Sequence, residues 1–300
     1  MGKAGVLLVG LCTVDLVHRV AELPAPGQKL QSIGVELVAG GPAANAAVTV
    51  AGMGGLARFV TTLGSHPLAE LARADLADHG VRVLDLRPEL PEPPSVSSIA
   101  VRDRDGERIV ISHNAAGVDP PHTLPSWAEL LVGMGALLVD GHHPVPAVAS
   151  ARAARGRRVP VVLDAGSDKP VLAELLPLVD VCACSASFRL GRASEKATER
   201  MVHQEGVPVV IRTDGARPVR WSVMAGNKIT AGKVRPPAVQ PRDTLAAGDA
   251  WHGALAIGIA RLGRVPTAAD LPILVDLANR VAATRIGVIG ARAWLPAVGP

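Results

Sequence analysis

The chain has 300 residues, of which 48% are hydrophobic and 19% are charged, and its formal net charge is +4. That length and hydrophobic content are enough to bury the core of one large globular domain. Because the net charge is small and the Lys and Arg residues are scattered, we expect no nucleic acid as partner.

Short runs of Val, Leu and Ile alternate with Ala-, Leu- and Arg-rich stretches of helical period. The stretches 68–79 and 145–155 predict helices, and the apolar runs predict strands at 5–10, 136–140, 159–164, 179–185 and 207–213. Near-continuous apolar strands that alternate with helices are typical of a parallel sheet covered on both faces. The sequence therefore predicts a doubly wound α/β fold.

Two early segments depart from this alternation. The first contains Pro24, Pro26 and Gly27, and the second alternates in strand fashion around the hairpin signal Asp105-Gly106. Together they predict a small β-sheet that closes as a lid over the carboxyl ends of the parallel strands, where such folds bind ligands. We predict a single domain over residues 1–300, with lid segments near 14–38 and 95–114.

A glycine pair, Gly40-Gly41, precedes an Ala-rich helical stretch that contains Asn45. Paired glycines permit close approach of the backbone to a ligand, and an Asn side chain both donates and accepts hydrogen bonds, as a sugar hydroxyl requires. Asp15, just after the first strand, can accept from two further hydroxyls. By itself a glycine pair more often marks a tight turn than a binding loop.

The late segment from Asp243 to Asp249, Asp-Thr-Leu-Ala-Ala-Gly-Asp, stands before an apolar run that predicts a helix. The small residues Ala246, Ala247 and Gly248 let backbone N–H groups approach a phosphate at the positive end of that helix. Asp249 can take the proton from an attacking hydroxyl while the amides stabilise a transferring phosphoryl group. The alternative is that Asp249 only caps the helix.

These two segments, in this order, resemble the two signature regions of the ribokinase/PfkB family of carbohydrate kinases. The Asp-Thr-x-x-Ala-Gly-Asp pattern is nearly complete, and the resemblance covers essentially the whole sequence. It implies a ribokinase-like fold and an ATP-dependent sugar kinase. In such kinases the residue at Asp249 is the catalytic base, and the amides at Ala246, Ala247 and Gly248 form an anion hole.

The resemblance also assigns ligand positions. Asp15, Gly41 and Asn45 match sugar-binding positions, with Gly40 in the same loop. Asp243 matches a position that in some members helps to hold a monovalent cation such as K⁺, and Mg²⁺ is implied together with ATP. The residues expected to contact the nucleotide are Ser185, Thr213, Gly215, Gly248, Asn279 and Ala283. Ser185 begins Ser-Ala-Ser-Phe, where many members have Asn-x-x-Glu, so the resemblance implies no water-mediated magnesium role there.

Several segments bear on the substrate. Pro42 stands where ribokinases commonly have Lys, so ribose is not the first choice. Segments 106–114, 139–143 and 163–170 look similar to ketohexokinases and to bacterial sulfofructose kinases, which predicts a ketohexose or related sugar, fructose-like or sulfofructose-like. In the latter kinases a Lys, an Asn and an Arg grip the sulfonate; Lys29 and Asn114 match the first two, and His142 replaces the planar guanidinium.

Each of these side chains also has a simpler interpretation. His142 is then a polar loop residue, Asn114 a turn former, and Lys29 an exposed lysine. Arg108, which in the lid can reach toward the phosphates or contact the substrate, is then a solvated strand residue.

Three rival functions are weaker. A nucleoside kinase of the adenosine type commonly stacks the base on aromatic rings, and this chain has two Phe and no Tyr. Against a non-catalytic sugar or nucleotide sensor stands the intact Asp249. A dehydrogenase is excluded because no Gly-x-Gly-x-x-Gly follows the first strand.

The remaining expectations concern assembly and location. Lids of this kind often pair between subunits in similar kinases, so we expect a homodimer through the lid. Cys12, Cys182 and Cys184 lack the spacing of a zinc site and are expected to be buried free thiols. We find no apolar run of about 18 residues and no signal peptide, so we expect a cytoplasmic protein without a membrane partner.

Overall fold

The computed structural model describes residues 4–114, 121 and 123–299. Its main body is a nine-stranded sheet in the order β13-β12-β11-β10-β9-β8-β1-β4-β5. The strands from β11 to β5 are parallel, and β12 and β13 add an antiparallel edge. The bounds are β1 Gly5–Val9, β4 Leu56–Thr61, β5 Val81–Asp85, β8 Met134–Val139, β9 Val161–Ala165, β10 Val181–Cys184, β11 Val209–Arg212, β12 Val219–Ala225 and β13 Lys228–Val234.

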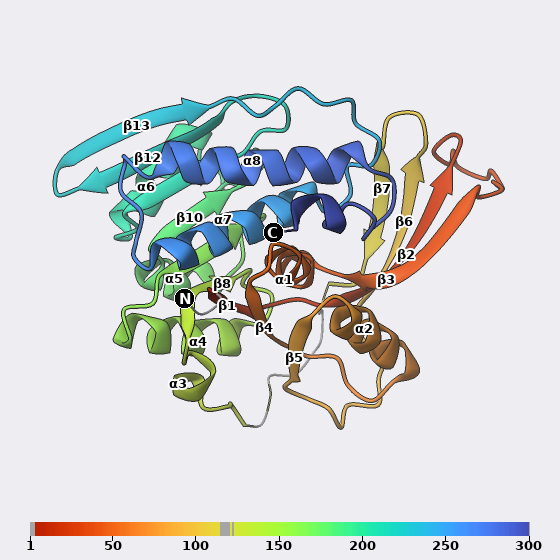
Figure 1. Cartoon of the computed structure of the whole chain (residues 1–300), viewed down its shortest axis with the longest axis horizontal. Helices are drawn as coiled ribbons and strands as arrows, with labels where there is room; N and C mark the ends of the chain where they lie inside the picture. The colour runs from red at the N-terminus through yellow and green to blue at the C-terminus, as the bar shows by residue number, and fades with distance from the viewer. Residues whose placement is uncertain (1–3, 115–120, 122, 300) are drawn as a thin grey trace.

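Helices cover both faces of this sheet, so the doubly wound α/β prediction is confirmed. One face carries α1 (Pro42–Gly52), α2 (Pro67–Asp78), α7 (Ala247–Leu262) and α8 (Leu271–Gly287). The other carries α3 (Trp127–Leu130), α4 (Pro144–Gly156), α5 (Leu172–Leu175), the 3₁₀ turn η1 (Leu176–Leu178) and α6 (Glu195–Gln204). A last 3₁₀ turn, η2 (Leu295–Val298), packs against α1 and α8. In Figure 1, α7 and α8 lie side by side on the near face of the sheet.

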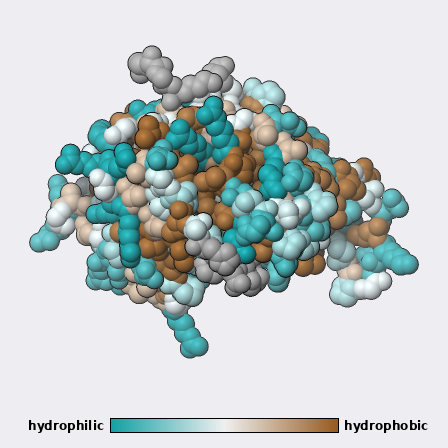
Figure 2. Space-filling model, turned by 90° about the horizontal axis from the view of Figure 1, so that it is seen from below, coloured by the Kyte–Doolittle hydropathy of each residue, from teal (hydrophilic) through white to brown (hydrophobic). Residues whose placement is uncertain are grey.

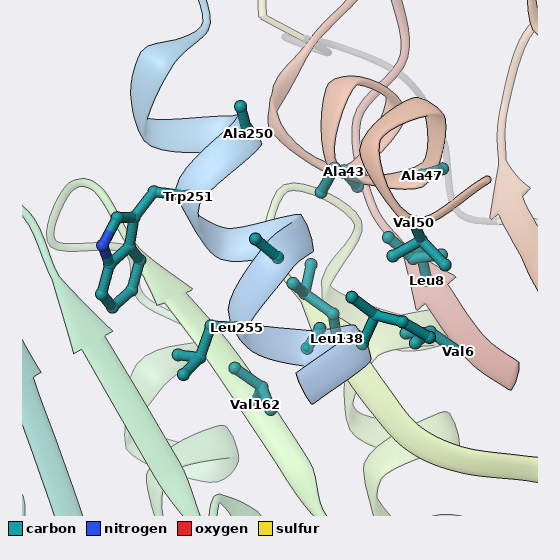
Figure 3. Close-up of a cluster of buried hydrophobic side chains, with 14 of the residues drawn as sticks. Val6, Leu8, Ala43, Ala47, Val50, Leu138, Val162, Ala250, Trp251 and Leu255 are labelled. Carbon is teal, nitrogen blue, oxygen red and sulfur yellow. The ribbon is translucent and has the colours of Figure 1, made fainter. Parts of the chain in front are cut away.

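The period-2 alternation of the strands divides the core into two layers. Val6 and Leu8 of β1 point to the layer under α1 and α7, and Leu7 and Val9 point to the layer under α4. Figure 3 shows Val6 and Leu8 packed between the side chains of α1 and α7. Both faces of these strands are buried, as their near-continuous apolar sequences predict.

A second, four-stranded sheet stands apart from the main body, at the right of Figure 1. Its order is β3-β2-β6-β7, with bounds β2 Thr13–Val20, β3 Gly34–Gly40, β6 Val96–Arg102 and β7 Arg108–Ser112. These strands fall in the two segments that the sequence assigned to a lid. We call this unit the small sheet.

Apolar side chains remain exposed on the outer strands of the small sheet: Val35, Leu37, Ile109 and Ile111. Figure 2 shows hydrophobic atoms at the surface of this projecting end. The pairing of two copies through the small sheet stays a prediction.

Two other expectations meet the structure here. Cys12, Cys182 and Cys184 are buried free thiols, as predicted. Among the described residues, no helix combines the length and the apolar character that crossing a bilayer requires.

The close crossing of α1 and α7 depends on a residue without a side chain. A Cβ atom added at Gly253 would lie 2.5 Å from the carbonyl oxygen of Ala46 and 2.8 Å from Cβ of Thr49. Helices can approach this closely only where one of them offers no side-chain bulk at the contact. The crossing therefore sets how near the first turns of α1 and α7 come to each other.

We expect Gly253→Ala to lower the free energy of unfolding by about 1–3 kcal/mol, because the added methyl group overpacks this contact. The measurement is urea-induced unfolding followed by circular dichroism. Gly156→Ala is the matched control, since nothing described lies within 4 Å of a Cβ atom at Gly156 and this helical position prefers Ala. A Gly253→Ala protein as stable as the Gly156→Ala protein would show that the contact is not tight.

Candidate active site

A cavity of about 180 Å³ lies between the small sheet and the carboxyl ends of the parallel strands. This is the end of an open α/β sheet at which ligands bind. The polar residues that line it are Thr13, Asp15, Asn45, Ser97, Ser112, Asn114, His142 and Asp249. The structure thus brings together residues from β2, α1, β6, β7, the segment after β8 and the start of α7. Of the predicted site residues, Gly41 also lines this cavity.

Asp249 and Asn45 are in direct contact although 204 positions separate them. Asn45 Nδ2 donates to Asp249 Oδ2 at 2.9 Å, so the first turns of α1 and α7 meet at this hydrogen bond. Burial raises the pKa of Asp249, and the hydrogen bond from Asn45 acts in the opposite direction. Asp249 is therefore a carboxylate with raised basicity on the wall of the cavity.

The loop before α7 has an unusual backbone. Ala246, the N-cap residue, has φ 55° and ψ 18°, a left-handed conformation that costs a residue with a Cβ atom about 1–2 kcal/mol. Such strain persists only where the surroundings impose it. Gly248 is exposed, and nothing described lies within 4 Å of where its Cβ atom would be. The start of α7 is thus open around Gly248, next to Asp249, although the N–H group of Ala247 is directed at the carbonyl oxygen of Thr244 at 3.5 Å. Its role as an anion hole stays a prediction.

Asp15 lines the same cavity from β2. Its carboxylate accepts a hydrogen bond from Thr13 Oγ1 at 2.5 Å and lies over Gly40, where any Cβ atom would overlap it. Burial raises the pKa of Asp15, whereas the hydroxyls of Thr13 and Ser97 lower it. The glycine at position 40 is therefore explained by the carboxylate that it accommodates.

Asp243 lies in the loop that leads into α7, where its partners are charged. Arg285 Nη2 and Arg19 Nη2 each lie 3.3 Å from Asp243 Oδ2. The N–H group of Leu245 donates to the other carboxylate oxygen at 3.0 Å. Two guanidinium groups already neutralise this buried carboxylate, so the site does not fit a monovalent cation bound to it. The expected K⁺ role of Asp243 thus finds no support in the geometry.

Three predicted substrate contacts, Lys29, Arg108 and Gly40 under Asp15, lie outside the cavity lining. Lys29 is exposed in the loop between β2 and β3. Arg108 Nη1 donates to Thr244 Oγ1 at 2.7 Å, and that hydroxyl donates to the carbonyl oxygen of Gly106 at 2.6 Å. Arg108 and Thr244 line a second, more open cavity of about 500 Å³ next to the anion-hole loop. The contact of Arg108 with a phosphate or with the substrate stays a prediction.

The sequence reasoning missed several buried polar residues beneath the site. Asp140 Oδ2 accepts from the N–H group of Leu11 at 2.8 Å, and Oδ1 accepts from that of His142 at 2.9 Å. Burial raises the pKa of Asp164 to about 6. His252 Nδ1 lies 3.5 Å from Asp164 Oδ2. Their positions directly after β8 and near the end of β9 were the signal that could have identified Asp140 and Asp164.

Apart from Gly248 at the start of α7, the residues predicted for the nucleotide follow β10 and β11 or belong to α8. Ser185 Oγ contacts the carbonyl of Gly166 at 3.3 Å, and the N–H group of Thr213 donates to Cys184 O at 2.9 Å. Gly215 has a positive φ of 54°, and Ala283 is partly exposed on α8. Their contact with a nucleotide stays a prediction.

Asn279 is more restricted than the sequence suggested. It is buried, and its Oδ1 accepts from Trp251 Nε1 at 2.9 Å. Its Nδ2 has no hydrogen-bond partner among the described residues. Only this amide nitrogen is left to contact a ligand.

Comparison with known proteins gives a consistent result. The model of the pfkB family of carbohydrate kinases matches residues 3–298. The chain is 25% identical to ribokinase from Haemophilus influenzae over 256 residues, covering 82% of each chain. It is 23% identical to ribokinase from Bacillus subtilis over 292 residues, covering 97% of this chain and 96% of that one. Arabidopsis thaliana ribokinase complexed with ribose and ATP has the same fold, with a TM-score of 0.75 at 22% identity over 98% and 96% of the two chains.

We expect Arg285→Met to destabilise the protein by about 3–5 kcal/mol, because it leaves the buried Asp243 carboxylate with one guanidinium partner fewer. Chemical denaturation measures the loss. Arg280→Met on the same helix is the control: Arg280 pairs with Asp276 at the exposed surface, where an ion pair contributes about 1 kcal/mol or less. Equal stabilities of the two variants would contradict the structural role of the buried pair.

Proposed function

This chain belongs to the pfkB family of carbohydrate kinases and is a phosphotransferase that acts on a sugar hydroxyl, and we propose that it phosphorylates a neutral monosaccharide held in the cavity between the small sheet and α7. The observation that carries the proposal is the contact of Asn45 with Asp249 on the cavity wall, beside the open N-terminus of α7. The hydrogen bond from Asn45 thus places a sugar-binding amide next to the proposed base, at the helix end proposed to bind phosphate.

The proposed steps follow from these positions. Asp15 and Asn45 orient the sugar by hydrogen bonds to its hydroxyls. Asp249 accepts the proton of one hydroxyl while that oxygen forms a bond to the γ-phosphorus of ATP, and the bond from this phosphorus to the bridging oxygen of ADP breaks. The N–H groups at the start of α7 stabilise the negative charge on the phosphoryl oxygens. No covalent enzyme intermediate is needed.

Magnesium enters with ATP in this proposal. Mg²⁺ is usually held by one or two carboxylates together with substrate phosphates and water. Among the described residues, no group of three or more His, Cys, Asp or Glu side chains could hold a metal ion. In this proposal the ion therefore arrives bound to the phosphates of ATP and neutralises their charge. This chain supplies few direct ligands to it.

The cavity lining supports a neutral substrate. Its described residues include the two carboxylates Asp15 and Asp249 but neither Lys nor Arg. Burial lowers the pKa of His142, which keeps that ring uncharged at neutral pH. A sulfonate or carboxylate head group in this cavity would meet negative charge without a compensating cation. This lining suits a neutral ketohexose better than a sulfofructose-like substrate.

The size of the cavity favours a sugar over a nucleoside as substrate. A cavity of about 180 Å³ is smaller than the pockets of about 300–1,000 Å³ that enclose drug-sized ligands. A monosaccharide suits this space better than a ribonucleoside does. A neutral ketohexose such as fructose is our first candidate, on the loop similarities of 106–114 and 139–143. Ribose is the second candidate, because the relatives that match are named ribokinases.

Asp249→Asn tests the base. We expect kcat to fall by about 10²-fold or more, since an amide cannot accept the hydroxyl proton. The assay measures ADP release with the preferred sugar, and Asp276→Asn on the exposed surface of α8 serves as the matched control. In the wild-type protein, burial raises the pKa of Asp249. As the pH falls, activity should therefore begin to decline above the ordinary aspartate pKa of about 4. Turnover within about tenfold of wild type would refute the assigned role.

A substrate panel tests the neutral cavity. We expect fructose or ribose to be phosphorylated with a kcat/KM at least about tenfold above that of sulfofructose, because a desolvated anion beside two carboxylates is unfavourable. His142→Arg should narrow this ratio by adding a cation to the lining. Adenosine is included to test the nucleoside alternative. A wild-type preference for sulfofructose would overturn the neutral-substrate proposal, and binding of sugars without turnover would favour a sensor.

A further inference from the structure

Arg292, in the segment between α8 and η2, contacts Asn45, the residue that donates a hydrogen bond to Asp249. Its Nη1 donates to Asn45 Oδ1 at 3.2 Å. The side chain is 13% exposed and does not belong to the cavity lining. Asn45 therefore lies between a guanidinium on one side and the Asp249 carboxylate on the other.

The guanidinium is fixed by its own partners. Arg292 Nη2 donates to Asp75 Oδ2 at 2.8 Å and to the carbonyl oxygen of Ala39 at 2.5 Å. Asp75 Oδ2 also accepts from the N–H group of Ala39 at 3.0 Å, so α2 and the end of β3 hold the ion pair in place. A partly buried Arg with a charged partner and two oxygen acceptors loses little further freedom when it contacts Asn45.

Arg292 decides which way the Asn45 amide points. An Asn side chain can be turned over, exchanging its oxygen and nitrogen, and either orientation fills the same space. A guanidinium only donates hydrogen bonds, so the amide oxygen must face Arg292 and the amide nitrogen must face Asp249. With a donor directed at it, the Asp249 carboxylate is stabilised in its ionised form.

We propose that Arg292 is a positioning residue for phosphoryl transfer, because it locks the Asn45 amide in the orientation that keeps Asp249 ionised and directed into the cavity. Without Arg292 the amide can turn and present its oxygen to a protonated Asp249. That orientation favours the neutral acid, which cannot act as a base. The catalytic consequence rests on the function proposed above; the effect on the ionisation of Asp249 does not.

Other charges also face Asp249 and set the background against which Arg292 acts. The surrounding titratable and charged groups come from β2, β7, the end of β8, β9 and α7: Asp15, Arg108, Asp140, Asp164 and His252. The carboxylates oppose ionisation of Asp249, whereas Arg108 and His252 favour it. Asn45 is the group whose side chain bonds directly to Asp249, which makes its orientation the most local control.

The test is an NMR titration of protein carrying ¹³C at the aspartate carboxyl carbons, with the Asp249 signal assigned by its loss in Asp249→Asn. We expect Arg292→Met to raise the pKa of Asp249 by about one unit, as the loss of one hydrogen bond to a charged group implies. Arg292→Lys retains a donor and the charge, and should stay closer to wild type. Arg292→Gln, which is too short to reach Asn45, has the same expected direction as Met and replaces it if Met does not fold.

A double-mutant cycle separates the amide from simple charge effects. In an Asn45→Ala background, Arg292→Met should shift the pKa of Asp249 by much less than in wild type. An equal shift in both backgrounds would mean that Arg292 acts through its charge alone, and would overturn the proposal. An unchanged pKa in Arg292→Met would overturn it as well.

Kinetics then connect the pKa to turnover. For Arg292→Met, the acid limb of kcat/KM should move to higher pH with the NMR pKa, and the rate should approach that of wild type above it. Arg261→Met is the matched control, because Arg261 donates to the carbonyl of Met53 at the other end of α1. A rate lowered equally at every pH would indicate a merely structural role and refute the proposal. If wild type phosphorylates no sugar while the pKa still shifts, the proposed function fails and the Asn45 mechanism stands.

Discussion

The close crossing of α1 and α7 is the constraint on which the site depends. Because Gly253 has no side chain at the crossing, the first turns of both helices come near enough for Asn45 to donate to Asp249 at 2.9 Å. The strained backbone at Ala246 then turns the start of α7 toward the same cavity. The core under these helices, built from alternating residues of the parallel strands, provides the rigid support that such a geometry requires.

Four carboxylates around the site differ in their partners. Asp75 and Asp243 are paired with guanidinium groups, and they hold the loops around the site. Asp15 and Asp249 have no such partner within ion-pair distance among the described residues, they face the cavity, and burial raises the pKa of both. Asp75 and Asp243, neutralised by arginine, thus support the fold, whereas Asp15 and Asp249 face the cavity without a paired cation.

The sequence predicted what is local and not what is distant. The strands, the small sheet and the positions of Asp249 and Asn45 follow from periodicity and from two short motifs. The contacts that hold these residues cannot be predicted in the same way. Arg292 and Asp75 are separated by 217 positions, and no sequence pattern indicates that they are in contact. The same limit applies to Asp243, whose ion pairs with Arg285 and Arg19 have no signal in the sequence. Lys29 lies in the loop between β2 and β3, where no strand or helix periodicity indicates which way a side chain faces.

Arg19 belongs to β2, yet it binds Asp243 in the loop that leads into α7. The hairpin between β6 and β7 reinforces this link, because a Cβ atom at Gly106 would lie 2.8 Å from Cα of Asp243. The small sheet cannot travel far without stretching that ion pair or carrying the loop along. The position of the small sheet is thus mechanically tied to that of the segment on which Asp249 stands.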